Sequence, residues 1–298
     1  MTLARSLDSK AEIISADSMQ IYRGMDIGTA KPTSADRQAV PHHMIDVADP
    51  YHDGFSVENW LEGANNAIGC ITARDATAIV VGGTNLYVQS LLSGLFQGPA
   101  ANDVLRESLR ELSLADLRTR LQSLDPDSAL RIHPNDQRRM IRAIEVTQAT
   151  GTPLSVLQSQ WSAGPPALPI GWMCVGLLPE APSNSRSINR RVKTMFDCGF
   201  LEEVRALQDG GSIGRQAAEA VGYRELARHL RGEVSLDEAF ESIKIRTRKL
   251  ARQQRTWLRR FRHIDRSEWC EAACGEEIEQ EFFGKVLGLA KSTFYENK

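Results

Sequence analysis

Apolar residues in the first third of the chain follow two periods, one typical of buried strands and the other of amphipathic helices. Residues 77–81 form a continuous run rich in β-branched side chains, which indicates a strand buried on both faces, and residues 12–16 form a second short strand. Apolar side chains recur at helical spacing over residues 60–73, and Gly82-Gly83-Thr84 leads into another such segment. This alternation predicts a parallel sheet covered on both sides by helices.

The middle of the chain has a different pattern. Residues 103–151 read as helical throughout, with many charges and no strand candidate. Asn135 or Asp136 is the expected N-cap of the last helix in this stretch. Gly-Pro-Pro at 164–166 predicts a linker, and residues 170–178 predict one more strand that returns to the sheet. The helical middle is therefore expected to be an insertion into an α/β core.

Two helical segments complete the predicted core. One covers residues 188–207 with a break near Gly199, and a long one covers residues 235–261, where Ser235 and Glu238 form a capping box at its start. The expected domains are an α/β core of residues 1–102 and 167–298 and a helical insertion of residues 103–166.

The long C-terminal helix carries an apolar face and a basic face. The apolar face consists of Phe240, Ile243, Leu250, Trp257 and Phe261, and the basic face of Arg248, Arg252, Arg255 and Arg259. From Lys244 to Arg262 there are nine Lys and Arg residues and no Asp or Glu, although the net charge of the whole chain is −2. Like charges on one face repel, so a phosphate backbone is expected to lie against them. The alternatives are a solvated face or pairing with acids from another segment.

Composition narrows the class of protein. The chain is 42% hydrophobic and 25% charged, as is usual for globular proteins. No apolar run approaches the roughly 18 residues of a membrane span, and the N-terminus lacks the apolar core of a signal peptide. The cysteines and histidines show no metal-ligand spacing, so no metal ligands are predicted among them. We expect a cytoplasmic protein with no membrane partner.

Two polar segments follow predicted strands. Asp17 comes after the first strand, and Gly82-Gly83-Thr84 after the second. Because ligands of open parallel sheets bind at the carboxyl ends of the strands, both segments are expected to meet at one site. A carboxylate there can act as a general base or hold a metal, and Thr84 can offer its hydroxyl. The alternative is that Asp17 and Thr84 only cap the helices that follow them.

Residues 16–32 (Ala-Asp-Ser-Met-Gln-Ile-Tyr-Arg-Gly-Met-Asp-Ile-Gly-Thr-Ala-Lys-Pro) closely resemble the tRNA dimethylallyltransferase family. Further matches follow in the family's order over nearly all of the chain up to about residue 266. They are Pro41-His42-His43 with Ile45-Asp46, Val81-Gly82-Gly83-Thr84-Asn85-Leu86-Tyr87, Arg131-Ile132-His133-Pro134-Asn135-Asp136, Arg142-Ala143-Ile144-Glu145-Val146, Gly199-Phe200 with Glu203-Val204, Val221-Gly222-Tyr223-Arg224 and Thr256-Trp257-Leu258-Arg259.

The resemblance implies an activity and a fold. The family transfers a dimethylallyl group from dimethylallyl pyrophosphate to the N6 amine of the adenosine 3′-adjacent to the tRNA anticodon. It implies a P-loop NTPase-like core with a helical insertion that contacts tRNA, Mg²⁺ as cofactor, the anticodon stem-loop as partner and a monomeric enzyme. Asp17 matches the family's general base, Thr84 a residue of the channel where base and donor meet, and Arg191 an arginine that faces pyrophosphate. The expected tRNA-contacting residues are Asp17, Ser18, Met19, Gln20, Thr84, Arg106, Arg138, Arg139, Met140, Ile141, Arg142, Gly222, Tyr223 and Arg224, with Arg248, Arg252 and Arg255 of the basic helix.

The chain departs from the family pattern in two places. The family begins with a strand and a Gly-x-x-x-x-Gly-Lys-Ser/Thr loop that hold pyrophosphate and Mg²⁺, and this sequence contains neither. We therefore expect a sheet without its first strand and unusual exposure around Ile13 and Val80. Ser187 stands where the family usually has arginine.

Three interpretations follow from the missing loop. The first is an active tRNA prenyltransferase whose true start lies upstream. The second is a remnant that binds tRNA without catalysis. The third is a small-molecule kinase or a prenyltransferase of free adenine nucleotides.

Overall fold

The computed structural model describes residues 1–7, 10–96, 98–161, 168–272, 284 and 286. The chain forms two compact units, one made of Met1–Leu92 with Ala167–Lys298 and the other of Ser93–Pro166. Each unit has its own hydrophobic core. The role expected of the helical insertion, contact with tRNA, stays a prediction.

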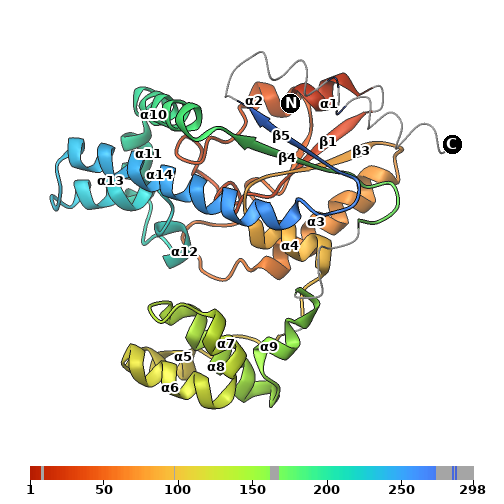
Figure 1. The fold of residues 1–298 in the computed structure, drawn as a ribbon. Helices are drawn as coiled ribbons and strands as arrows, with labels where there is room; N and C mark the ends of the chain where they lie inside the picture. The colour runs from red at the N-terminus through yellow and green to blue at the C-terminus, as the bar shows by residue number, and fades with distance from the viewer. Residues whose placement is uncertain (8–9, 97, 162–167, 273–283, 285, 287–298) are drawn as a thin grey trace. The chain divides into compact units, whose positions relative to one another are not determined.

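The first unit contains a parallel sheet with β1 (Ala11–Ser15) in its centre. β2 (His42–His43) pairs with one edge of β1, and β3 (Thr77–Val81) pairs with the other. Ile14 has no exposed surface and packs in a cluster with Trp60 and Tyr87, which come from α3 (Val57–Thr72) and α4 (Asn85–Ser93). The predicted strand–helix alternation is confirmed (Figure 1).

A second parallel pair is formed by β4 (Cys174–Pro179) and β5 (Ser267–Ala272). Residues 170–178 were expected to form a strand that returns to the sheet of β1; the strand is present, but β4 pairs with β5 in a separate sheet, and neither β5 nor the two-residue β2 was predicted. Within the described part of the chain, β3 pairs only with β1 and β4 only with β5. Among these residues, β3 and β4 therefore each have one edge without a paired strand.

The unusual exposure expected around Ile13 and Val80 is absent at Ile13, and near Val80 it is found at the neighbouring residue Val81. Ile13 is only 6% exposed, so that expectation is wrong: β1 is the middle strand, and Ile13 packs in a cluster with Ala4 and Val40. Val80 is half-buried and its neighbour Val81 is 52% exposed, because β3 lies at an edge.

Of the helices that remain in the first unit, those within residues 181–258 pack around one cluster. A break at Gly199, which has a φ of +95°, separates α10 from α11 as predicted, and the Ser235–Glu238 capping box begins α14. Val192, Phe200 and Ile243 from three of these helices are buried together. The helices are α1 (Thr2–Ser6), α2 (Ser34–Ala39), α10 (Ala181–Asp197), α11 (Phe200–Asp209), α12 (Arg215–Ala218), α13 (Tyr223–Leu230) and α14 (Leu236–Leu258), with a 3₁₀ turn at Arg259–Phe261.

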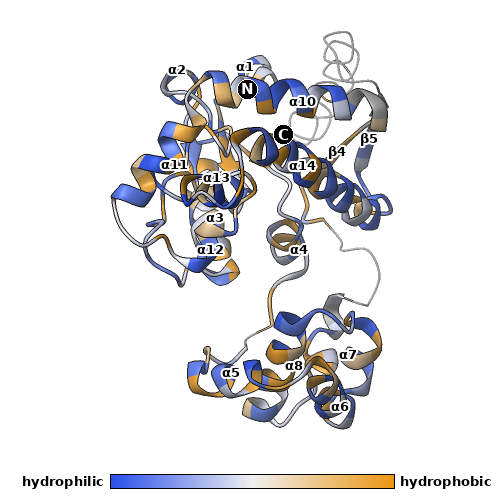
Figure 2. Ribbon diagram, turned by 90° about the vertical axis from the view of Figure 1, so that its left-hand side faces the viewer, coloured by the Kyte–Doolittle hydropathy of each residue, from blue (hydrophilic) through white to orange (hydrophobic). Residues whose placement is uncertain are grey.

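The second unit is helical, as its sequence predicts. Asp136 is the N-cap of α8 and accepts the N–H of Arg139 at 3.1 Å, while Gly151 ends that helix in the left-handed conformation with a φ of +71°. Leu117 and Met140 lie in its core, and Figure 2 shows apolar residues gathered on α8. Its elements are α5 (Asp103–Arg110), α6 (Leu114–Leu124), α7 (Pro126–Arg131), α8 (Gln137–Thr150), α9 (Leu154–Leu157) and a 3₁₀ turn at Ser159–Trp161.

A carboxylate of α11 fastens the loop that follows the first strand. Glu203 accepts the backbone N–H groups of Asp26 at 2.9 Å, Ile27 at 2.7 Å and Gly28 at 3.1 Å. The Tyr223 hydroxyl donates to the same carboxylate at 2.6 Å. Since one side chain satisfies four donors, its loss leaves several polar groups without a partner.

We predict that Glu203→Ala lowers the free energy of unfolding by about 2–4 kcal/mol, because buried donors that lose a charged acceptor are costly. Urea denaturation measures this change. Glu202→Ala is the matched control: it removes an exposed carboxylate from the same helix turn and is expected to change the free energy by less than about 0.5 kcal/mol. Equal losses in both variants would contradict this account of the loop.

Candidate active site

Asp17 stands directly after β1, at the carboxyl edge of the sheet. Its Oδ1 accepts the backbone N–H of Met19 at 2.8 Å and that of Gln20 at 3.3 Å. Both contacts are local and close a turn of the kind that aspartate favours. The turn therefore fixes the carboxylate at the strand end while the side chain stays partly exposed.

Thr84 comes from the second segment and meets the first. Its hydroxyl accepts the N–H of Ser18 at 2.9 Å and contacts the Ser18 hydroxyl at 3.2 Å. The backbone N–H of Thr84 donates to the Ala16 carbonyl at 3.1 Å. The structure thus brings together the two polar segments that follow β1 and β3.

The glycines before Thr84 allow this close approach. A Cβ at Gly82 would lie 2.2 Å from the Ala16 carbonyl oxygen, and one at Gly83 would lie 2.3 Å from Nε2 of Gln254. The Gln254 amide donates to the Gly83 carbonyl at 3.0 Å. The glycine loop is therefore enclosed between the end of β1 on one side and α14 on the other.

Aromatic side chains lie near Asp17 at the end of β1. Trp60 stacks on Tyr87 with ring centroids 4.4 Å apart, and its indole N–H donates to the Ser15 carbonyl at 2.9 Å. Burial raises the pKa of Tyr87, and the charges of Tyr22 and Asp17 raise it further. Burial also raises the pKa of Tyr22, to about 12. Both phenols are therefore protonated at neutral pH, and Asp17 is the candidate base beside them.

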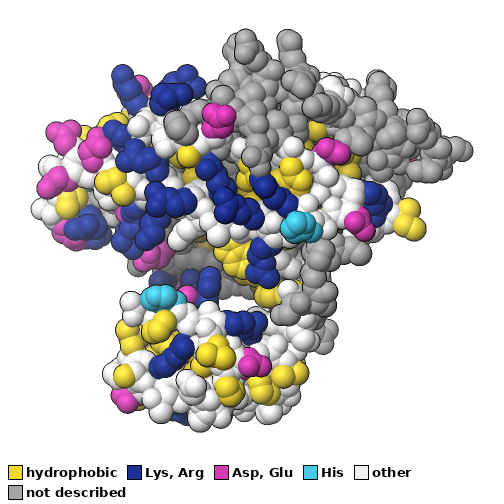
Figure 3. Space-filling model, in the orientation of Figure 1, with side chains coloured by type: hydrophobic (Ala, Val, Ile, Leu, Met, Phe, Trp, Pro, Cys, Tyr) yellow, Lys and Arg dark blue, Asp and Glu magenta, His cyan; other side chains and the backbone are white. Residues whose placement is uncertain are grey.

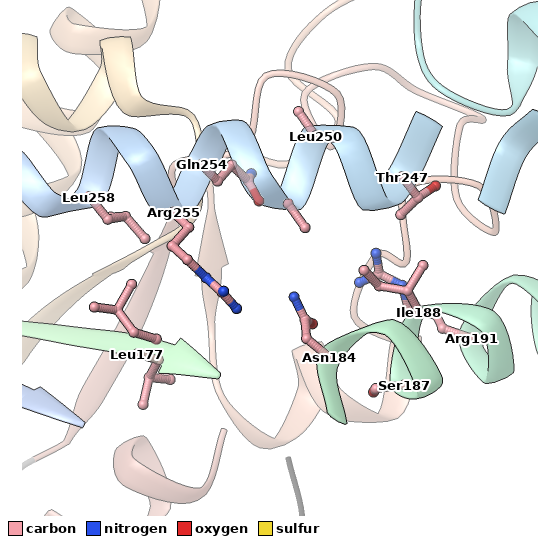
Figure 4. A pocket seen from close by; sticks show the side chains of 12 residues that line it. Leu177, Asn184, Ser187, Ile188, Arg191, Thr247, Leu250, Gln254, Arg255 and Leu258 are labelled. Carbon is pink, nitrogen blue, oxygen red and sulfur yellow. The ribbon is translucent and has the colours of Figure 1, made fainter. Parts of the chain in front are cut away.

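A pocket of about 220 Å³ lies between β4, α10 and α14 (Figure 4). One part of its wall is apolar, and the Arg191 and Arg255 side chains line the rest together with the Asn184 amide. None of its lining residues is acidic, so the pocket suits an anion that carries a hydrocarbon chain. They are Leu177, Leu178, Asn184, Ser187, Ile188, Arg191, Thr247, Leu250, Ala251, Gln254, Arg255 and Leu258.

Two sequence observations fall in this pocket. Arg191, the residue expected to face pyrophosphate, lines it, and so does Ser187, where the family usually has arginine. Gln254 belongs to the pocket wall and also bonds to Gly83, so the pocket adjoins the Thr84 loop. Leu250 is 42% exposed, although it was expected in the apolar stripe, because it lines the pocket.

The cationic side chains of α14 are only partly paired with acids. Arg246 and Lys244 pair with Glu225 at 3.0 Å and Glu241 at 2.6 Å. Arg248 donates to the Asn189 side chain at 2.8 Å. Arg252 is exposed, and no acidic side chain among the described residues contacts it. Figure 3 shows Lys and Arg side chains gathered along the part of the surface that α14 occupies.

Several residues expected to contact tRNA have other contacts in the structure. Tyr223 is 2% exposed and its hydroxyl binds Glu203, so its side chain serves packing. Gly222 has a φ of +97° and begins α13. Arg224 is paired with Glu219 at 3.0 Å and remains at the surface. The expected tRNA contact of this segment stays a prediction.

In the second unit the expected residues separate into two groups. Arg138 and Arg139 are exposed on α8, whereas the side chains of Met140 and Ile141 lie in the hydrophobic core. Arg106 of α5 and Arg142 of α8 instead bind the buried carboxylate of Glu145, which was not predicted as a site residue.

Gln254 and Glu203 were also missed by the sequence analysis. Gln254 lies between the apolar face and the basic face of α14, and no sequence pattern marks that position as part of a site. Glu203 was noted only as part of a family match. For the carboxylate of the second unit a signal existed: Glu145 is an acid among apolar helical positions, which calls for a cationic partner.

Metal and membrane features are limited. Among the residues that the structure describes, no three His, Cys, Asp or Glu side chains gather as metal ligands. No described helix is long and apolar enough to cross a bilayer.

Comparison with known proteins identifies the family. The family model of IPP transferases matches residues 20–261. The chain is 42% identical over 258 residues to a tRNA dimethylallyltransferase of Geobacter metallireducens, covering 85% of this chain and 82% of that relative. It is 40% identical to the tRNA dimethylallyltransferase of Geobacillus thermodenitrificans, covering 97% and 91%.

A solved structure agrees with these relatives. The full-length tRNA isopentenylpyrophosphate transferase of Bacillus halodurans has a TM-score of 0.67 and 33% identity, covering 98% of this chain and 91% of that one. The predicted fold class, an α/β core of the P-loop NTPase-like kind, is confirmed. Since the family model spans most of the sequence and the relatives match nearly their whole length, the chain belongs to the IPP transferase family.

Proposed function

We propose that the protein transfers a dimethylallyl group from dimethylallyl pyrophosphate to the N6 amine of the adenosine 3′-adjacent to a tRNA anticodon. One observation carries this proposal. The Asp17 carboxylate and the Thr84 loop meet at the carboxyl edge of the sheet, and Gln254 joins that loop to an arginine-lined apolar pocket. The family relationship supports the same reaction.

The reaction needs a base for its nucleophile. The N6 amine is a poor nucleophile, and a C–N bond forms at the allylic carbon as its C–O bond to pyrophosphate breaks. The amine proton passes to the Asp17 carboxylate, and the pyrophosphate leaves with the electron pair of the broken bond. The turn that holds Oδ1 of Asp17 on the N–H groups of Met19 and Gln20 orients the carboxylate for this transfer.

The donor fits the pocket by its chemistry. Leucines of β4 and α14 would contact the branched hydrocarbon, and Arg191 with Arg255 would bind the pyrophosphate. Guanidinium groups stabilise the negative charge that grows on the leaving group. The same pocket therefore serves both ends of the donor.

Mg²⁺ remains a prediction of the family resemblance. Asp17 is the carboxylate at this edge of the sheet, and the described residues around it do not form a metal site by themselves. No step above depends on the ion.

The RNA would meet the exposed arginines. Arg252 on α14 and Arg138 on α8 are exposed and available to phosphates, and Arg139, which pairs with Asp136 at 3.3 Å, is exposed beside Arg138. The target base must leave its stack to reach Asp17, which costs a few kcal/mol and least in a loop. We propose the anticodon stem-loop as the partner and a monomer as the active form.

Asp17→Asn is expected to lower kcat for prenyl incorporation into an anticodon stem-loop by about 10²–10⁴-fold, because it removes a general base. Its tRNA affinity is expected to stay within about twofold of the parent, since the amide keeps the size of the side chain. Asp75→Asn, an exposed position in the turn before β3, is the control and should leave both values unchanged. Full turnover in Asp17→Asn would exclude Asp17 as the base.

Arg252→Glu is expected to weaken tRNA binding and to reduce the slope of log K against log salt by about one, because one phosphate contact is lost. Lys249→Glu makes the same change of charge at an exposed position of α14 outside the arginine face. Binding measured over a salt series compares the two. Identical losses would mean that α14 acts only through its net charge.

The glycine loop gives a further expectation. Gly82→Ala would press a methyl group against the rigid Ala16 carbonyl, whereas Gly83→Ala would meet only the movable end of Gln254. We expect Gly82→Ala to destabilise by about 1–3 kcal/mol and Gly83→Ala by about 1 kcal/mol, the worth of the bond to Gln254. In a Gln254→Ala background the second cost should vanish. Additive losses of Gly83→Ala and Gln254→Ala in thermal unfolding would contradict this description.

A further inference from the structure

The strongest unexplained feature of the second unit is a buried carboxylate shared by two arginines. Glu145 lies on α8 and its side chain is 1% exposed. We propose that Glu145 is a positioning residue for RNA binding, which holds Arg106 and Arg142 so that their outer N–H groups face a phosphate. This inference rests on the proposed binding of tRNA.

The contacts of Glu145 use both of its oxygens. Oε1 accepts the backbone N–H of Asn102 at 2.8 Å and Nε of Arg106 at 2.9 Å. Oε2 accepts Nη2 of Arg106 at 2.9 Å and Nη1 of Arg142 at 2.5 Å. Arg106 is thus bound through two parallel bonds, the arrangement that fixes a guanidinium plane most firmly.

The carboxylate is charged in this setting. Burial raises the pKa of Glu145, but the bonds from Arg106, the Asn102 N–H and Arg142 outweigh burial, and its pKa lies below the usual range. One negative charge therefore meets two positive charges, and the cluster keeps a net charge of +1.

Both arginines are bound by Glu145 and remain partly exposed. Their side chains are 28% exposed for Arg106 and 35% for Arg142, against 1% for Glu145. Nη2 of Arg142 also donates to the Pro99 carbonyl at 3.2 Å, which fixes its second edge. Exposed Arg138 lies one turn before Arg142 on α8. The second unit therefore presents fixed guanidinium groups next to a free one, a pattern suited to adjacent phosphates.

A purely structural role of Glu145 predicts a different effect on RNA binding. A buried ion pair contributes little to stability compared with apolar residues of similar volume. If Glu145 only filled the core, the orientation of the two guanidinium groups would not matter for RNA. Their shared carboxylate matters to RNA only if it sets their geometry.

The test uses a substitution in which simple electrostatics and positioning predict opposite signs. Glu145→Gln removes one negative charge, so attraction to any polyanion should rise. If Glu145 positions the arginines, affinity for a tRNA anticodon stem-loop should instead fall by about tenfold. Binding of heparin, a polyanion without RNA shape, should stay equal or become tighter. Glu111→Gln, an exposed residue at the end of α5, is the control with the same change of charge, and its RNA affinity should not fall.

Circular dichroism and hydrogen exchange of residues 103–150 show whether the second unit stays folded. A folded Glu145→Gln protein with unchanged or tighter stem-loop binding would overturn the proposal. If that variant unfolds the unit, Glu145→Asp decides instead, because it keeps both arginines and the negative charge, while its shorter side chain loses the parallel bonds to Arg106. Weaker stem-loop binding with unchanged heparin binding then supports positioning, and equal stem-loop affinity overturns it. A parent protein that binds heparin but no stem-loop would refute the proposed function itself.

Discussion

The close packing of the Gly82-Gly83 backbone determines how the parts of the first unit meet. On one side Gly82 lies against the Ala16 carbonyl, which leaves no room for a side chain, and on the other Gly83 lies against the movable Gln254 amide. These contacts join the ends of β1 and β3 to the C-terminal part of α14. Because the loop also carries Thr84, the site exists only while the sheet edge and the basic helix keep their positions relative to each other.

Several features of the site follow from this packing of the glycine loop between β1 and α14. Gln254 brings the wall of the arginine-lined pocket beside the Thr84 loop, so the donor and the base would approach one edge of the sheet. On α14 Arg252 lies three residues before Arg255, which faces the pocket. One helix therefore contributes to the pocket wall, to the support of the Thr84 loop and to the basic surface.

Local signals in the sequence predicted most elements, and contacts over long separations were not predicted. The run at 77–81, the capping box of Ser235 and the break at Gly199 depend on near neighbours, and the structure has all three. The short strand β2 depends on its pairing with β1 and has no pattern of its own. The expectation for Ile13 failed because it concerned which edge of the sheet is open, a property of topology.

The same distinction applies to the site. The meeting of Asp17 and Thr84 could be predicted from a rule about parallel sheets, since each residue follows a strand. The roles of Arg106 and Arg142 were expected from the family resemblance, but their shared partner was not, because Glu145 lies 39 residues beyond Arg106 in the sequence.

The hydrogen bonds of Glu203 also determine when the loop after β1 can fold during synthesis of the chain. The second unit is built from helices that contact near neighbours in the chain, which favours rapid folding. The loop at residues 26–28 instead waits for a partner 175 to 177 positions later. On a ribosome the inserted helices can therefore fold before Glu203 is available to bind the segment after Asp17. A helix from the part of the first unit that follows the insertion then completes the surroundings of one of its first strands.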